Sequence, residues 1–262
     1  MIDFHDKTAL VTGAASGIGA ALAAGLAARG ASVILADIDE AGLSATAAHI
    51  GPAAHVIVCD LAQAEAPGRL VEQSHALRGR LDLVCSNAGI SRRRKVLKEM
   101  RDAALERLFA VNFFAGLAIA QSYVRVLEGT GARGRLMLTG SENSLSVPAM
   151  VRGAGLAMYG ATKHALLIAA EWMRDELGDA PLDLHVLLPG AVYTPLIARA
   201  LPDPAKAPPE LGLIMPERCA ELALGGMDLG LFYIPTHAHL ADDMHPRLRG
   251  IEAALQALGL KH

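Results

Sequence analysis

The sequence predicts an α/β protein in which helices cover both faces of a seven-stranded parallel sheet. Three observations lead to this fold class. The chain of 262 residues is long enough for one large domain. Short apolar segments alternate along it with longer segments of helical periodicity. Several of the short segments are apolar throughout, as expected for strands that are covered on both sides. We therefore expect residues 1–262 to form a single domain.

Each element follows from its local pattern. The predicted strands are 8–12, 32–37, 55–60, 81–86, 135–139, 184–188 and 231–234. The first helix begins near Ile18, where apolar residues recur every three or four positions, and it ends at Gly30. Later helices are predicted near 63–77, 100–127, 158–177, 216–226 and 246–258. The segment 201–209, with four prolines in nine residues, is predicted to be a loop inside the domain.

Composition excludes several classes of partner. A net charge of −3 gives no electrostatic reason to bind nucleic acid or an anionic membrane. Three widely spaced cysteines indicate reduced core residues of a cytoplasmic protein. The N-terminus has no leader pattern, and no apolar run reaches the ~18 residues that span a bilayer. The cluster of His237, His239, His245, Asp242 and Asp243 matches no metal-ligand spacing, so we expect surface histidines and no metal.

A glycine-rich loop follows the first predicted strand. Residues 12–19 read TGAASGIG and lead directly into a helix. Glycines permit a tight turn and let backbone N–H groups approach a pyrophosphate, while the helix N-terminus supplies unpaired donors and a positive dipole. The loop therefore predicts a dinucleotide-binding fold of the Rossmann-type, doubly wound kind.

Asp37 predicts which dinucleotide is bound. It ends the second strand, about 20 residues after the glycine loop, where a carboxylate can accept hydrogen bonds from ribose hydroxyls. The same carboxylate repels a 2′-phosphate. Ala14, Ala15 and Ile38 provide no positive charge to hold that phosphate. We therefore predict NAD in preference to NADP. The alternative role for Asp37 is to cap the following helix.

Tyr159 and Lys163 are the candidate acid–base pair. If 158–177 is helical, residues four apart share a face, and the phenol can meet the ammonium. A lysine charge ~5 Å away favours the phenolate by roughly 3 kcal/mol, or about two pKa units, at an effective dielectric of ~20. A tyrosine with such a lowered pKa could exchange a proton with an alcohol near neutral pH.

The order and spacing of these motifs resemble the short-chain dehydrogenase/reductase family over nearly the whole chain. The further matching pieces are Asp60-Leu61, Asn87-Ala88-Gly89, Asn112, a serine after the fifth strand, and Pro189-Gly190 followed by Thr194. The resemblance implies direct hydride transfer between NAD(H) and a secondary alcohol or ketone. It implies cofactor contacts from Gly13, Ser16, Gly17, Ile18, Gly19, Asp37, Ile38, Asp60, Leu61, Asn87, Ala88, Gly89, Tyr159, Lys163, Pro189, Gly190, Val192 and Thr194.

The resemblance also implies catalytic roles. Tyr159 would exchange the substrate proton, and Lys163 would lower the Tyr159 pKa and bind the nicotinamide ribose. A serine would polarise the substrate oxygen. Asn112 would bend its helix locally and hold a water behind the lysine. The alternative for Asn112 is a helix-interior asparagine that bonds its own backbone.

Three serines compete for the polarising position. Ser141 follows the strand 135–139, where a hydroxyl at the strand end can face the cofactor, but it lies 18 residues before Tyr159. Ser146 has the spacing that is common in the family, and Ser144 falls between the two. We expect Ser141, with 147–156 forming a lengthened loop after the strand.

The remaining expectations concern the substrate and partners. Residues 190–226 should cover the substrate, and their apolar side chains predict apolar walls. The resemblance implies a dimer or tetramer packed through the helices near 100–127 and 158–177. The basic run Arg92-Arg93-Arg94-Lys95 is expected to be a solvated loop. The alternative function is an NAD(H)-sensing protein of the same fold without turnover, which loss of the tyrosine or lysine would mark.

Overall fold

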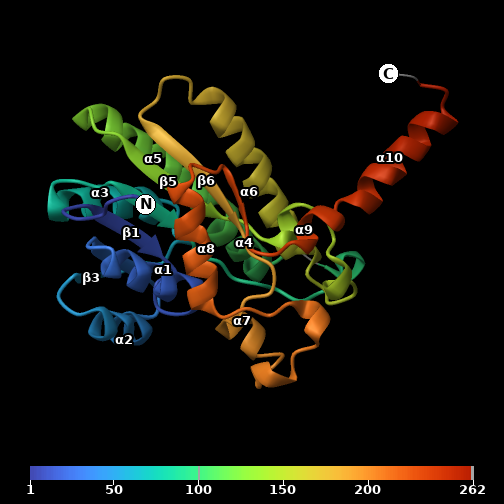
Figure 1. The fold of residues 1–262 in the computed structure, drawn as a ribbon, viewed down its shortest axis with the longest axis horizontal. Coiled ribbons are helices and arrows are strands. Elements are labelled where there is room, and N and C mark those ends of the chain that lie inside the picture. The colour runs from blue at the N-terminus through green and yellow to red at the C-terminus, as the bar shows by residue number, and fades with distance from the viewer. Residues whose placement is uncertain (100, 261–262) are drawn as a thin grey trace.

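A computed structural model describes residues 1–99 and 101–260, and its centre is a parallel sheet of seven strands (Figure 1). The strands are β1 Thr8–Thr12, β2 Ser32–Asp37, β3 Ala54–Val58, β4 Leu83–Ser86, β5 Gly134–Thr139, β6 Leu182–Leu188 and β7 Tyr233–Pro235. Their spatial order is β3-β2-β1-β4-β5-β6-β7. The order reverses between β1 and β4, and in open parallel sheets ligands bind at the carboxyl ends of the strands beside such a point. The predicted doubly wound fold is confirmed, with each strand end within two residues of its prediction.

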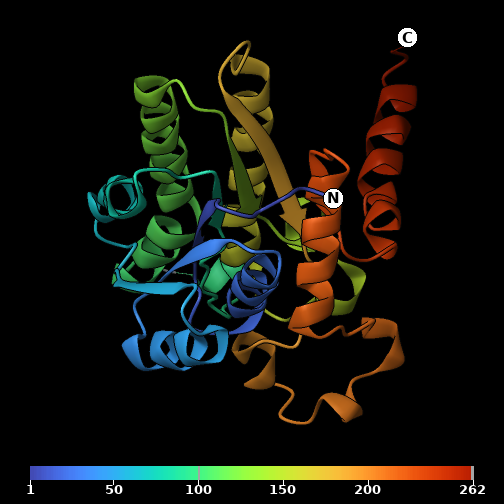
Figure 2. The same cartoon turned by 60° about the vertical axis from the view of Figure 1, so that its left-hand side comes forward.

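Helices cover both faces of the sheet (Figure 2). One face carries α1 Gly17–Ala28, α2 Glu40–Ile50 and α8 Pro216–Asp228, and the other carries α3 Ala66–Arg78, α5 Ala115–Thr130 and α6 Ala157–Glu176. Neighbouring residues of β1 divide between two hydrophobic clusters: Leu10 packs with α3, α5 and α6, whereas Ala9 and Val11 pack with α1 and α8. This division explains why the strands are apolar at successive positions.

Helices α2 and α10 differ in how clearly the sequence indicates them. Helix α2 was not among the predicted helices, because it buries only Leu43 and Thr46 and so has little apolar periodicity. Its N-terminus is capped by Asp39, whose carboxylate accepts from the backbone N–H of Gly42 (3.1 Å). Helix α10, His245–Ala257, confirms the predicted helix 246–258 and extends away from the rest of the protein (Figure 1). No residue within α10 is buried.

The predicted helix 100–127 contains an irregular turn. Met100 lies outside the described residues. From Ala103 the chain forms α4 Ala103–Phe109, a π-helical turn η2 Ala110–Phe114, and then α5. The local bend that the resemblance implied for Asn112 is this π-helical turn.

The helical stretch Ala103–Thr130 is long and rich in apolar residues. It has 28 residues, and an 18-residue window within it has a mean hydropathy of 1.5, so by length and composition alone it could cross a bilayer. Its apolar residues have a different explanation in this fold. Ile119, Tyr123 and Leu127 are fully buried and pack against the sheet and α3. The Tyr123 hydroxyl donates to the Leu81 carbonyl (3.0 Å), which ties the helix to the edge of the core.

Candidate active site

The glycine loop brings backbone, rather than side chains, to the carboxyl end of β1. Gly13 and Gly17 have φ of +68° and +55°, values that glycine adopts at little cost. A methyl group at Gly19 would overlap the Gly13 carbonyl, and one at Gly13 would lie 2.8 Å from the Cα of Ala88. Ser16 precedes α1 in extended backbone and makes no side-chain cap, so side chains leave the first N–H groups of α1 available. The loop has the shape and donors that a pyrophosphate requires.

Asp37 is fixed at the end of β2 beside this loop. Its carboxylate accepts from the backbone N–H of Ala15 (3.2 Å) and of Asp39 (3.1 Å). The helix cap proposed as an alternative role for Asp37 is instead provided by Asp39. Asp37 therefore faces the cleft with an oriented carboxylate, next to the exposed side chain of Ile38.

Arg107, on α4, reaches the same part of the cleft and was missed in the sequence. Its guanidinium binds both carboxylate oxygens of Asp60, at 2.8 and 3.1 Å. The hydrogen bond from Arg107 is the main reason that the pKa of Asp60 lies below its usual range. Asp60 also accepts from the Ala62 N–H (3.0 Å), so its position does not depend on the arginine alone. The contact joins residues 47 positions apart, and no local pattern predicts it.

The segment Asn87-Ala88-Gly89 links the ends of β1, β4 and β5. The Thr12 hydroxyl accepts from the N–H groups of Asn87 (2.9 Å) and Ala88 (3.0 Å), and the Asn87 amide donates to the Thr12 carbonyl (3.1 Å). Thr139 donates its hydroxyl to Asn87 Oδ1 (3.3 Å). These bonds stiffen the sheet at the cleft, as the resemblance implied. Thr12 and Thr139 were not among the predicted site residues.

Asn112 uses its whole amide to fix the chain beyond Gly89. Its Oδ1 accepts from the Ile90 N–H (2.8 Å), and its Nδ2 donates to the Ile90 carbonyl (2.9 Å) and to Thr162 Oγ1 (3.1 Å). The alternative of bonding its own helix backbone is therefore wrong. A methyl group at Gly89 would lie 3.5 Å from Lys163 Nζ and 3.6 Å from Asn112 Oδ1, so the three residues converge.

Tyr159 and Lys163 lie one turn apart near the start of α6, as predicted. Lys163 Nζ lies 6.0 Å from the centre of the Tyr159 ring and donates to the Thr139 carbonyl (2.6 Å). Lys163 is almost wholly buried, and burial lowers its pKa to about 8. Tyr159 is half-buried at the cleft.

The Tyr159 pKa has the opposite direction to the prediction. Burial raises this pKa, the nearby Glu142 carboxylate raises it further, and a hydrogen bond with Ser141 opposes them. The Lys163 ammonium, whose own charged form burial disfavours, does not offset the cost of burying a phenolate. The expectation of a lowered Tyr159 pKa is therefore wrong.

Among the three serines, only Ser141 lines the cleft. Its hydroxyl lowers the pKa of Tyr159, against the effect of burial, and accepts from the backbone N–H of Asn143 (3.2 Å). Ser144 accepts from the Ser141 N–H (3.1 Å) and completes a capping box around a short 3-10 turn, whereas Ser146 is buried. The segment 147–156 forms the expected loop, with glycines of positive φ at 153 and 155.

The chain after β6 closes the other side of the cleft. The Pro189 carbonyl accepts from the Glu142 N–H (2.7 Å), and Val192 is buried. Thr194 packs closely on the glycine loop, because a methyl group at Gly17 would lie 2.9 Å from its Cγ2. The short helix α7, Pro195–Ala198, then adds apolar side chains to the wall.

The glycine loop, Asp37, Ser141, Tyr159 and Lys163 all line one cleft of about 440 Å³. All the predicted site residues line it except Gly19, which supports the loop from behind, and Asn112, which acts through Ile90. Leu196 and Ile197 belong to the apolar wall that the sequence predicted, whereas Cys59, Arg107, Val111 and Arg199 were not singled out. Among the described residues there is no group of three or more histidine, cysteine or acidic side chains that could hold a metal.

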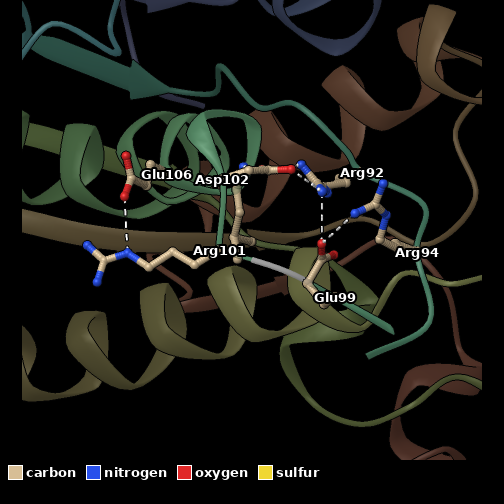
Figure 3. A network of polar contacts seen from close by, with 7 residues as sticks. Arg92, Arg94, Glu99, Arg101, Asp102 and Glu106 are labelled. Carbon is tan, nitrogen blue, oxygen red and sulfur yellow. Dashed lines mark hydrogen bonds and ion pairs between the residues drawn. The ribbon is translucent and has the colours of Figure 1, made fainter. Parts of the chain in front are cut away.

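The basic run beside the cleft is only partly solvated (Figure 3). Arg92 binds Glu99 (2.8 Å) and both oxygens of Asp102 (2.7 and 2.8 Å), and its side chain is 14% exposed. Arg92 holds the pKa of Asp102 at about 2, and Asp102 in turn caps α4 through the Leu105 N–H (2.9 Å). Arg93, Arg94 and Lys95 are exposed, as expected. The expectation of a solvated side chain was wrong for Arg92, which fixes the loop that precedes α4.

Sequence comparison identifies the family. A family model described as short chain dehydrogenase matches residues 7–205, so the chain belongs to the short-chain dehydrogenase family. Its relatives are named as dehydrogenases, and the protein is an oxidoreductase of that family.

Two relatives and two solved structures show the extent of the likeness. A 1-deoxy-11-beta-hydroxypentalenate dehydrogenase of Streptomyces avermitilis is 36% identical, over 88% of this chain and 85% of the relative. A 2,5-dichloro-2,5-cyclohexadiene-1,4-diol dehydrogenase of Sphingobium indicum is 34% identical, over 82% and 84%. A short-chain dehydrogenase from Burkholderia phymatum, solved with NAD, has the same fold, with a TM-score of 0.82 at 24% identity over 98% and 97% of the two chains. A short-chain dehydrogenase from Sphingobium yanoikuyae, solved with NADPH, gives 0.76 at 25% identity over 98% and 96%.

Proposed function

We propose that the protein interconverts a secondary alcohol and the corresponding ketone with NAD(H). The observation that carries the proposal is the meeting of Tyr159, Lys163 and Ser141 in one cleft with the glycine loop. A phenol, an ammonium and a hydroxyl around one point can bind an alcohol oxygen and move its proton. The names of two relatives each denote an alcohol, one of them a ring diol, which supports a cyclic alcohol as substrate.

Tyr159 is the proposed acid–base residue. Its hydroxyl would take the proton of the alcohol during oxidation and return it during reduction. The Ser141 hydroxyl, which lines the same cleft as Tyr159, would donate to the substrate oxygen and hold it beside the phenol.

Lys163 is proposed to hold the nicotinamide ribose. Its Nζ donates one hydrogen bond, to Thr139, which leaves two further donors for ribose hydroxyls. Asn112 is proposed to lead the proton to solvent through a water near Lys163. Both N–H groups of its amide are taken by Ile90 and Thr162, so the water would donate to Oδ1, which accepts one bond and has a further lone pair.

The residues of the cleft fit a dinucleotide. Gly13, Gly17 and the start of α1 offer close backbone approach and free N–H donors for the pyrophosphate, and Asp37 and Asp60 lie where the adenosine half would rest. When bound, the nicotinamide ring exchanges the hydride with the substrate carbon. We propose NAD over NADP because Asp37 holds an oriented carboxylate at the ribose position, with Ile38 rather than a cation beside it.

A homo-oligomer packed through α5 and α6 is also proposed. Large apolar side chains lie exposed on these helices or at their start: Phe114 is 58%, Ile168 53% and Trp172 60% exposed. Side chains of this kind are common at interfaces between subunits. Light scattering of the purified protein should give the mass of a dimer or tetramer, and Trp172→Glu should lower that mass.

The decisive test of the proposed function is a screen for NAD reduction against a panel of secondary alcohols, with cyclic alcohols prominent. Turnover with at least one cyclic alcohol is expected. Tight NADH binding without turnover of any alcohol or ketone would instead favour the NAD(H)-sensing alternative.

A further inference from the structure

The segment 236–239, which follows β7, contacts three parts of the chain that border the cleft. His237 lies against the Pro189-Gly190 turn and against Gly212 of the substrate-covering segment. His239 contacts Glu142, the residue after Ser141. The sequence predicted these histidines to be surface groups without a role. Both are instead only partly exposed.

Both ring nitrogens of His237 take part in hydrogen bonds. Nε2 lies 2.8 Å from the Gly212 carbonyl, which can only accept, so Nε2 donates to it. Nδ1 lies 2.7 Å from the Thr236 hydroxyl, which in turn accepts from the Gly190 N–H (3.1 Å). A continuous chain of hydrogen bonds therefore runs from Gly190 through Thr236 and His237 to Gly212.

The His237 ring is also held by shape. A methyl group at Gly190 would lie 2.7 Å from Nδ1, and one at Gly212 would lie 3.3 Å from Cδ2. Gly212 has a φ of +58°, so a side chain there is disfavoured for a second reason. The ring thus packs between two backbone segments that approach it because neither has a side chain. One of them, Gly190, lines the cleft directly.

A second contact links the same segment to the catalytic serine. His239 Nε2 lies 3.0 Å from Glu142 Oε2, and the Glu142 side chain is 11% exposed. The Glu142 N–H also donates to the Pro189 carbonyl (2.7 Å), and Pro189 belongs to the Pro189-Gly190 turn that His237 contacts. The rings of His237 and His239 lie edge to face, 5.4 Å apart. The serine turn and the Pro189-Gly190 turn are therefore tied to one short segment.

We propose that His237 is a positioning residue that holds residues 195–215, the part of the substrate-covering segment that precedes α8, in place over the cleft. It acts through the Gly212 carbonyl on one side and through Thr236 and Gly190 on the other. The consequence for catalysis rests on the proposed function, but the consequence for the segment does not. Loss of the ring removes the bond that fastens Gly212, so the segment should open more often and bind substrate less well.

Limited trypsin digestion tests the fastening without any turnover. Residues 195–215 contain two trypsin sites, Arg199 and Lys206, and mass spectrometry identifies cleavage at each. His237→Ala should be cut there roughly tenfold faster than the natural protein, as expected when one hydrogen bond of a closed state is lost. His237→Gln should be cut at nearly the natural rate, because its amide can still donate to Gly212. His245→Ala, a change of an exposed histidine in α10, is the matched control.

Steady-state kinetics test the consequence for the site. With an alcohol that the natural protein turns over, His237→Ala should raise KM for the alcohol about tenfold and change kcat less than threefold, and His237→Gln should restore KM. Equal digestion of His237→Ala and the natural protein overturns the proposal. So does equal impairment of the Ala and Gln variants with a lowered Tm, because that marks a merely structural ring. If no alcohol is turned over, the proposed function fails and the digestion result still decides the role of His237.

Discussion

The buried charge of Lys163 makes a measurable prediction about stability. Its pKa is lowered to about 8 in the folded protein, against an ordinary value of 10.5. The unfolded chain therefore binds this proton more tightly than the folded protein does. Between the two pKa values, unfolding takes up a proton, so the free energy of unfolding rises with pH. The cost of burying the ammonium is fully present below pH 8 and fades towards pH 10.5.

The size of the effect follows from these two pKa values. The burial of the charged lysine costs about 3 kcal/mol of stability at pH 7 and roughly 1.4 kcal/mol at pH 9.5. Lys163→Met removes the titration. The stability of the natural protein relative to this variant should therefore improve by about 2 kcal/mol between the two pH values. Other groups titrate in both proteins, and their contributions largely cancel in the comparison.

Urea unfolding at pH 7.0 and pH 9.5, on the natural protein and on Lys163→Met, measures this difference. Lys98→Met is the control, because Lys98 is exposed and this variant removes a lysine without removing a buried charge. The reasoning would be refuted if the difference in free energy of unfolding between the natural protein and Lys163→Met were the same at both pH values within about 0.5 kcal/mol, since burial of the ammonium would then have no cost.

Three further predictions concern the cleft. Ser141→Ala should lower kcat by roughly a hundredfold or more. Ser144→Ala should mainly lower the free energy of unfolding by about 1 kcal/mol, because it removes part of the capping box. Equal losses of kcat in the two variants would contradict the assignment of Ser141 as the polarising serine. The natural protein should prefer NAD over NADP by roughly a hundredfold in kcat/KM, and Asp37→Ala should reduce that preference to within about tenfold, since it removes the repulsion of a 2′-phosphate. Arg107→Ala should raise the pKa of Asp60 towards its ordinary range, which carboxylate NMR titration measures, and an unchanged pKa would exclude the ion pair.

The sequence predicted those parts of the fold that depend on residues close together in the chain. The strands were found because burial on both faces leaves an apolar run, and the glycine loop because only glycine permits its close approaches. Tyr159 and Lys163 were found because a helix of known period brings residues four apart together. Helix α2 was missed because it is held by one cap and two buried residues rather than by a strong apolar face.

The parts that could not be predicted depend on contacts between distant residues. Arg107 meets Asp60 only when β3 and β4 have taken their places in the sheet, because Asp60 follows β3 and α4 follows β4. His237 meets Gly190 and Gly212 only when β7 has joined the sheet. The pKa of Tyr159 was predicted with the wrong sign for the same reason. The nearby lysine could be read from the sequence, but the burial of the phenol and the Glu142 charge could not.

The most direct test of the central claim is the turnover of Tyr159→Phe with an alcohol that the natural protein oxidises. The account predicts that kcat falls by roughly a thousandfold or more, while the Kd for NADH stays within about twofold, because the phenol acts in proton transfer. Tyr233→Phe, which removes an exposed hydroxyl bonded to Glu171, should keep natural turnover. Turnover by Tyr159→Phe close to that of the natural protein would contradict the account.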